Sequence, residues 1–150
     1  MQLAESIQQS KILLLDYTTH IGALETLIAK AIPESSTDLQ FHALEEIRAK
    51  SEAKEINMGK GFALSHARIE GIQILQTSVA LFGEKTNYLP GDPVHTVFCT
   101  MIPPSESRVY LKFMSTLTRF LLQDNIELAF LQRDINAIVQ ALKEFDAFQA

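Results

Sequence analysis

The chain has few of the features that mark secreted, membrane-spanning or disulfide-stabilised proteins. It contains one cysteine among 150 residues, Cys99, so an intrachain disulfide is excluded. The apolar neighbours of Cys99 favour a buried, unreactive thiol. The N-terminus lacks the basic start and apolar stretch of a signal peptide, and no apolar run approaches the roughly 20 residues that a membrane-spanning helix requires. We therefore expect a cytoplasmic protein with no integral membrane segment.

Positive charge is also scarce. The 13 lysine and arginine residues are outnumbered by 18 aspartate and glutamate residues, which gives a net charge of -5. This balance argues against a nucleic-acid partner, because binding to a phosphate backbone relies on a broad basic surface. With 47% apolar and 21% charged residues, the composition is that of an ordinary globular protein. We expect residues 1–150 to form a single domain with a substantial core.

Motifs for nucleotides and metals are missing as well. The chain has no Gly-x-x-x-x-Gly-Lys-Ser/Thr loop, no dinucleotide fingerprint and no Gly-x-Ser-x-Gly elbow. None of its histidines pairs with another His, Cys or carboxylate at a metal-ligand spacing; they are His20, His42, His66 and His95. We therefore expect no cofactor and no metal site. The simplest interpretation of each histidine is a satisfied surface residue, with His66 the strongest functional candidate.

Apolar patterns predict an alternation of strands and helices. Short apolar runs predict strands over residues 11–17, 62–66, 72–82 and 94–102, with a loop over residues 83–91. Helical spacing of apolar residues predicts helices over residues 21–32, 38–53 and 135–145. A further helix reaches Leu122 from a cap at Ser105 or Ser107, and a capping-box pattern at residues 124–127 starts a short helix to about Leu131. Thr18 or Thr19 offers an N-cap for the first of these helices. The pattern favours an α/β (α+β) fold, a mixed β-sheet with helices on both faces.

Residues 59–68, Gly-Lys-Gly-Phe-Ala-Leu-Ser-His-Ala-Arg, are the most informative stretch. An apolar run ends in His66, and Arg68 follows two residues later. A histidine at the end of a strand with cations nearby can accept a phosphoryl group. The two glycines, Gly59 and Gly61, could let backbone amides approach an anion closely. Ser65 cannot act with His66 as a catalytic pair, because neighbours on a strand point to opposite faces.

This stretch resembles the active-site signature of enzyme IIA domains of the bacterial phosphotransferase system, of the fructose–mannitol and nitrogen-regulatory type. The signature reads Gly-x-Gly-x-Ala-hydrophobic-Pro-His, often followed by Ala-Arg. Its matching positions here are Gly59, Gly61, Ala63, Leu64, His66, Ala67 and Arg68. Weaker similarities lie at residues 23–27, 92–94, 103–104 and 111–115, so the resemblance covers nearly the whole chain. It implies an enzyme IIA mannitol-like fold.

Several positions depart from the pattern of this family. Ser65 replaces the proline before the histidine, and Tyr110 replaces a second histidine found in many members. Lys50 falls where the family has an upstream arginine, with Arg48 close but out of register. Glu55 and Ile56 replace a Ser-Thr pair. A carboxylate beside a phosphoryl group would repel it, unless the side chain of Glu55 points to solvent.

The resemblance implies a phosphocarrier. Members of the family take a phosphoryl group from the phosphohistidine of HPr and pass it to a IIB domain or use it as a signal. By resemblance, the expected partners are an HPr-like phosphocarrier protein and a IIB domain or a regulated partner protein. We expect a stand-alone domain without a IIB or IIC part, which favours the nitrogen-regulatory type.

The resemblance also assigns roles to individual residues. His66 would be the nucleophile, and Lys50, Arg48 and Arg68 the candidate charge stabilisers. The phosphate loop would consist of Gly59, Gly61 and Ser65. Two alternatives stay open: a degenerate regulatory binding module that does not transfer phosphate, and an unrelated α/β domain with a chance match.

Overall fold

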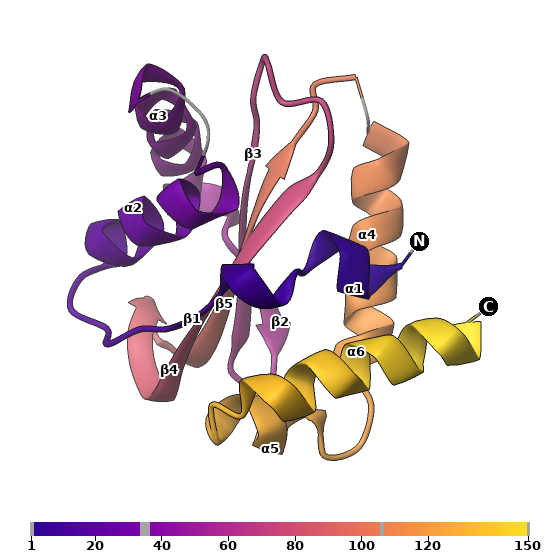
Figure 1. Cartoon of the computed structure of the whole chain (residues 1–150). Coiled ribbons are helices and arrows are strands. Elements are labelled where there is room, and N and C mark those ends of the chain that lie inside the picture. Colours follow the sequence, from indigo (N-terminus) through magenta and orange to yellow (C-terminus); the bar gives the residue numbers. More distant parts are fainter. Residues whose placement is uncertain (1, 34–36, 106, 150) are drawn as a thin grey trace.

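A computed structural model describes residues 2–33, 37–105 and 107–149, with the side chains of residues 50–54 and 107 left undescribed. It has three layers, in which a five-stranded mixed sheet is covered by helices on both faces (Figure 1). This architecture confirms the predicted fold class. Across the described residues, no helix combines the length and the apolar character needed to cross a membrane.

The elements alternate along the chain much as the sequence patterns predict. The helices are α1 (Leu3–Ser6), the short 3₁₀ helix η1 (Gln9–Lys11), α2 (His20–Ala31), α3 (Thr37–Lys54), α4 (Ser107–Leu121), α5 (Ile126–Leu131) and α6 (Ile135–Gln149). The strands are β1 (Ile12–Leu14), β2 (Ile56–Gly59), β3 (Phe62–Arg68), β4 (Gln76–Leu89) and β5 (Asp92–Ile102). Thr19 is the N-cap of α2, because its side-chain oxygen accepts a hydrogen bond from the amide of Gly22 at 2.9 Å.

The sheet has the strand order β1-β4-β5-β3-β2. Strands β3 and β5 run parallel in the centre, and each forms an antiparallel hairpin with a neighbour, β2 for β3 and β4 for β5. In the parallel register His66 lies opposite Thr100, two residues before both strands end. Because parallel strands end at the same edge of a sheet, His66 lies close to that edge.

Each face of the sheet carries its own apolar core. On one face α2 and α3 pack on odd-numbered residues of β3, such as Ala63 and Ala67. On the other face α1, α4, α5 and α6 pack on even-numbered residues, such as Phe62 and Leu64. Successive side chains of a strand point to opposite faces, so His66 belongs to the face covered by α4.

The two ends of the described chain meet on the α4 side of the sheet (Figure 1). The carboxylate of Asp146 in α6 accepts hydrogen bonds from the amides of Leu3 and Ala4, both at 2.8 Å. These amides lie at the start of α1 and have no partner within the helix, so the buried carboxylate caps them. The contact explains how this four-residue helix is held in place. The sequence pattern did not predict the helix.

The prediction for β4 is wrong at both ends. The strand begins at Gln76 rather than residue 72, and it continues to Leu89 through the segment expected to be a loop. Gly83 has a φ of 75° and lies at an irregularity in the pairing with β5. A Cβ there would meet the Arg133 side chain at 2.4 Å. Here the glycine allows a bend inside the strand and close packing, and it does not end the strand.

Candidate functional site

His66 lies half-buried near the end of β3, on the face that α4 covers. The ring of Tyr110 in α4 stacks on the imidazole, with the two centroids 5.0 Å apart and the planes at 30°. The Nδ1 atom of His66 is buried. Attack on an incoming group by this ring would therefore involve the other nitrogen, Nε2.

Tyr110 stands where the resemblance placed a second histidine. Its side chain is nearly buried, at 9% exposure. Burial raises the pKa of the Tyr110 phenol, and the positive charge of Arg68 opposes that shift. The phenol therefore stays protonated near neutral pH, and its ring covers one side of His66 without offering a second nitrogen nucleophile.

Arg68 lies on the same face of the sheet as His66, two residues further along β3. Its side chain is exposed, and its guanidinium donates a hydrogen bond to the carbonyl of Pro104 at 3.5 Å. Because the positive charge of Arg68 acts to lower the pKa of Tyr110, the guanidinium lies on the side of the site that holds this ring. The structure thus brings together His66, Tyr110 and Arg68.

Two buried threonines continue this polar site across the sheet. Thr100 is the register partner of His66, and its hydroxyl lies 3.0 Å from that of Thr77 in β4. Both threonines are fully buried. Residues opposite one another in neighbouring strands share a face, so both hydroxyls lie on the same face of the sheet as His66. We did not predict this pair, although hydroxyls within otherwise apolar strands are a readable signal.

Helix α3 carries the other two cationic residues that were expected to stabilise charge, Arg48 and Lys50. Arg48 is half-exposed and forms an ion pair with Glu45 at 3.6 Å, one turn earlier in the same helix. Helix α3 packs on the sheet face opposite to His66. Lys50 belongs to α3, but its side chain lies outside the described residues. Charge stabilisation by Arg48 or Lys50 therefore stays a prediction.

Gly59 and Gly61 do not form a phosphate loop beside His66. They make the turn between β2 and β3, with φ angles of 83° and 85°. Gly61 precedes the strand and His66 lies five residues further on, a span of about 16 Å in extended chain. The buried His95 ring fills the space beside Gly61 and contacts the carbonyl of Lys60 at 2.8 Å. The structure therefore does not bring these two glycines together with His66, and their anion-binding role stays a prediction.

Ser65 is not part of a phosphate loop either. It is fully buried on the face opposite to His66, and its Oγ lies 2.7 Å from the hydroxyl of Tyr88. Glu55 lies on that same face, where its Oε1 contacts Nε2 of His20 at 2.6 Å. The Glu55 side chain is 4% exposed, so it points neither to solvent nor to His66. The repulsion expected between Glu55 and a phosphoryl group does not arise from this arrangement.

Among the described residues, His95, His42 and Cys99 do not assemble a second reaction centre. Burial lowers the pKa of His95, whose ring contacts Lys60 and Thr96. His42 is exposed on α3. Burial also raises the pKa of the Cys99 thiol. Within residues 2–33, 37–105 and 107–149, no three His, Cys, Asp or Glu side chains are grouped so that they could hold a metal ion.

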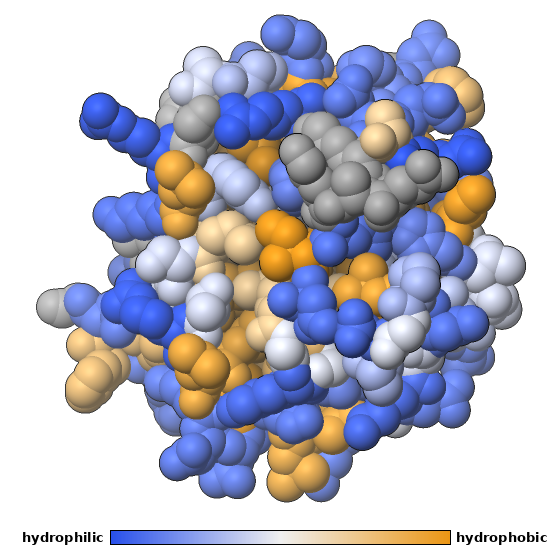
Figure 2. All heavy atoms as spheres, turned by 180° about the vertical axis from the view of Figure 1, so that it is seen from behind, coloured by the Kyte–Doolittle hydropathy of each residue, from blue (hydrophilic) through white to orange (hydrophobic). Residues whose placement is uncertain are grey.

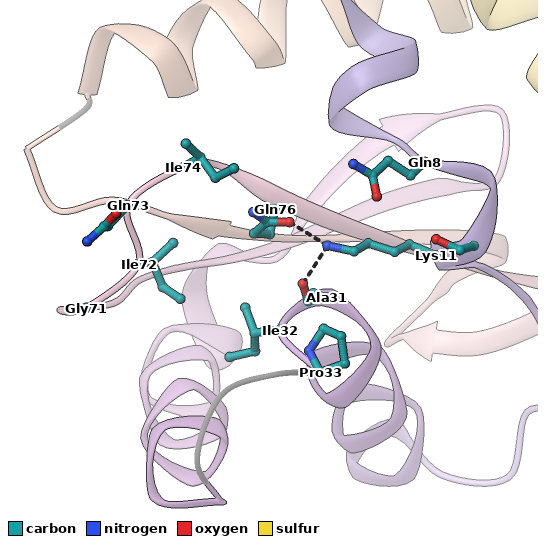
Figure 3. Close-up of a pocket in the computed structure, with 11 residues that line it drawn as sticks. Gln8, Lys11, Ala31, Ile32, Pro33, Gly71, Ile72, Gln73, Ile74 and Gln76 are labelled. Atoms are coloured by element: carbon teal, nitrogen blue, oxygen red, sulfur yellow. Dashed lines mark hydrogen bonds between the residues drawn. The ribbon is translucent and has the colours of Figure 1, made fainter.

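A pocket of about 520 Å³ lies away from His66, between the end of α2 and the segment before β4 (Figure 3). Lys11 reaches across it and donates hydrogen bonds to the carbonyl of Ala31, at 2.9 Å, and to the side chain of Gln76. Ala31 is the last residue of α2, so the lysine caps this helix end. The cation is thus engaged in holding elements together, and the pocket supplies no acid–base pair.

Apolar side chains also reach the surface. Figure 2 shows them gathered across the middle of the face seen from behind, bordered by hydrophilic side chains. One exposed apolar residue, Leu111, directly follows Tyr110 in α4 and is 64% exposed. Patches of this kind commonly mark sites where proteins associate.

Comparison with known proteins gives a consistent picture. The family model for the "Phosphoenolpyruvate-dependent sugar phosphotransferase system, EIIA 2" matches residues 5–145. None of the curated proteins compared with the chain matches it.

Three solved structures illustrate the likeness in fold. The nitrogen regulatory protein IIA-Ntr from Neisseria meningitidis is 20% identical, with a TM-score of 0.81 over 93% of this chain and 98% of its own. IIA mannitol from Escherichia coli is 12% identical, with a TM-score of 0.70 over 93% and 96%. The complex of enzyme IIAMTL and phosphorylated enzyme IIBMTL from Escherichia coli contains a chain that is 11% identical, with a TM-score of 0.71 over 94% and 96%.

Proposed function

Because the chain belongs to the EIIA 2 family of the phosphoenolpyruvate-dependent sugar phosphotransferase system, we propose that it is a phosphocarrier whose acceptor is His66. The observation that supports this most is the placement of His66: half-buried at the end of a central strand, under Tyr110, with Arg68 on the same face. An HPr-like phosphocarrier protein would be the donor. A IIB domain or a regulated partner protein would receive the phosphoryl group or respond to it.

The transfer step needs little beyond a nucleophile and charge stabilisation. A neutral imidazole is available near pH 7, since the unperturbed pKa of histidine is about 6.5. Nε2 of His66 attacks the phosphorus, the phosphorus–nitrogen bond of the donor breaks, and the electron pair stays on the donor imidazole. Because Nδ1 is buried, the new bond forms at Nε2. Arg68 would offset the charge on the phosphoryl oxygens, and Arg48 and Lys50 are further candidates for this role.

A protein partner is needed at both ends of this transfer. The exposed Leu111, next to Tyr110 in α4, offers an apolar contact beside the acceptor. The likeness to the chain in the IIAMTL–IIBMTL complex supports a IIB domain as one partner. The likeness to IIA-Ntr supports a regulatory role, and both roles fit a cytoplasmic protein.

Phosphorylation with purified components tests the proposal directly. The protein is incubated with phosphoenolpyruvate, enzyme I and HPr, and acid-labile phosphate is measured on wild type, His66→Ala and His42→Ala. His42 is an exposed histidine of α3 and serves as the matched control. We expect label on wild type and His42→Ala and none on His66→Ala. An unlabelled wild type, or equal label on His66→Ala, refutes the proposal.

A second candidate function is a regulatory module that docks a partner without phosphotransfer. The changes from the family pattern at Ser65, Glu55 and Tyr110 favour it. In that case a purified partner would bind the unmodified protein, and His66→Ala would bind the same partner with equal affinity. Phosphate-dependent binding would instead favour the phosphocarrier.

A further inference from the structure

A second polar cluster lies inside the protein, beneath the candidate site. It consists of His20 in α2, Glu55 immediately before β2, Ser65 in β3 and Tyr88 in β4. We call it the Tyr88 cluster. It lies on the sheet face opposite to the His66 ring, because Ser65 and His66 are neighbours on one strand.

The side chains of the Tyr88 cluster contact one another in a continuous series. The hydroxyl of Tyr88 lies 2.7 Å from Oγ of Ser65, and both residues are buried, at 1% and 0% exposure. The imidazole of His20 lies against the Tyr88 ring, with centroids 4.5 Å apart and planes at 31°. Nε2 of His20 in turn contacts Oε1 of Glu55 at 2.6 Å. A partly exposed imidazole is thus linked through Tyr88 to the residue before His66.

Glu55 is the last member of this series and lies immediately before β2, the strand that pairs with β3. Ile56 pairs with Leu64 in the antiparallel β2–β3 hairpin, so Glu55 lies beside Ser65. Its carboxylate is 4% exposed. A buried carboxylate requires a partner of opposite charge or hydrogen-bond donors, and among the described residues His20 is its ion-pair partner. The contact ties the start of α2 to the residue before β2, and β2 is the hairpin partner of the strand that carries His66.

We propose that the Tyr88 cluster positions His66. The His20–Glu55 pair holds the Tyr88 side chain, the Tyr88 hydroxyl holds Ser65, and Ser65 fixes the strand backbone from which His66 projects. These are positioning residues, because they lie on the far side of the sheet from the imidazole. The inference rests on the proposed function of His66 as the acceptor, and it concerns how that acceptor is held.

The test compares Tyr88→Phe with Tyr17→Phe. Tyr17 lies edge-on to Tyr88, with centroids 6.5 Å apart, so the control removes the same atom from a neighbouring ring. Two measurements are made well below the unfolding temperature of each variant. One is the NMR titration of the His66 imidazole in unphosphorylated protein. The other is the rate of labelling at increasing concentrations of phospho-HPr.

We expect Tyr88→Phe to change the chemical shifts and the titration of His66. We also expect it to lower the labelling rate at saturating phospho-HPr about tenfold, since small displacements of a reacting group are costly. The half-saturating concentration should not change, because Tyr88 and Ser65 are both buried and lie on the sheet face opposite to His66. Tyr17→Phe should match wild type in both measurements. A purely structural role would lower the melting temperature of Tyr88→Phe and leave His66 unaffected, which would overturn the inference.

A double variant separates positioning from simple damage. In Tyr88→Phe the Ser65 hydroxyl loses its partner, and an unpaired buried hydroxyl is itself disruptive. Adding Ser65→Ala removes that hydroxyl, so position 65 no longer holds an unpaired buried group. Continued slow labelling in the double variant supports positioning, whereas recovery of the wild-type rate overturns it.

Failure of the inference can be told apart from failure of the proposed function. If wild type accepts no phosphoryl group, the proposed function fails, and the NMR titration still decides the positioning role. If wild type is labelled but His66 behaves alike in Tyr88→Phe and Tyr17→Phe, the positioning role alone fails.

Discussion

Gly59 and Gly61 share a left-handed backbone conformation but have different surroundings. Their φ angles are 83° and 85°. A Cβ at Gly61 would lie 2.3 Å from Cδ2 and 2.7 Å from Nε2 of His95, whereas a Cβ at Gly59 would meet nothing within 4 Å. Alanine at either position therefore adds the same backbone strain. The difference in stability between the two variants measures the contact with His95.

The magnitudes can be estimated from these contacts. A left-handed backbone conformation costs an alanine about 1–2 kcal/mol. His95 is fully buried, and its ring nitrogens lie 2.8 Å from the carbonyl of Lys60 and from Oγ1 of Thr96. Displacing this ring strains the packing and breaks hydrogen bonds, which adds about 2–3 kcal/mol. We expect Gly59→Ala to lose about 1–2 kcal/mol and Gly61→Ala about 3–5 kcal/mol.

Urea unfolding measures these losses.

The same variants also show whether the turn takes part in the reaction, because an anion-binding loop would be impaired by either substitution. We expect folded Gly59→Ala to accept phosphate at the wild-type rate, since the turn lies at the far end of β3. Equal losses of stability in the two variants would refute the steric argument. Slow labelling of fully folded Gly59→Ala would refute the structural role of the turn.

Three further predictions concern other residues. Tyr110→Ala should shorten the lifetime of phosphorylated His66 severalfold, because water then reaches the uncovered side of the ring; an unchanged decay of labelled protein would contradict this. Burial lowers the pKa of His95 in the folded state, so the unfolded state binds more protons, and stability should fall as pH drops below about 6.5. Between pH 8 and pH 5 the urea midpoint of His95→Asn should therefore fall less than that of wild type. An equal fall in the two proteins would refute this role of His95. The buried Cys99, whose pKa burial raises, should resist thiol reagents until the protein unfolds, and rapid modification of native protein would be the contrary result.

Much of the fold could be predicted because apolar periodicity reports burial directly. Helices α2 and α6 and strand β5 were predicted to within a few residues, since each carries one clear pattern. Strand β4 could not be predicted through Gly83, because a glycine that follows an apolar run suggests a break, and its close packing against Arg133 joins positions distant in sequence. The four residues of β2 are too few to show a pattern.

The candidate site was harder to anticipate than the fold. The motif drew attention to His66, but it also grouped Gly59 and Gly61 with it, and a motif does not show that an extended strand separates them. Thr77 and Thr100 join the site only through the register of three strands. The distance of Arg48 from the site depends on which face of the sheet α3 covers. Each of these relations is set by tertiary packing, which residue spacing along the chain does not record.

Two departures from the family signature, Ser65 and Glu55, are connected in the structure through side-chain contacts. A proline before the histidine would fix φ at that position, and Ser65 gives up this rigidity. Glu55 introduces a carboxylate close to the strand. In the structure, however, Ser65 is held by Tyr88, and Glu55 is held by His20, whose ring rests on Tyr88. Side-chain contacts can thus supply the rigidity that a proline ring would give to the backbone. The altered signature therefore does not by itself argue for a lost acceptor.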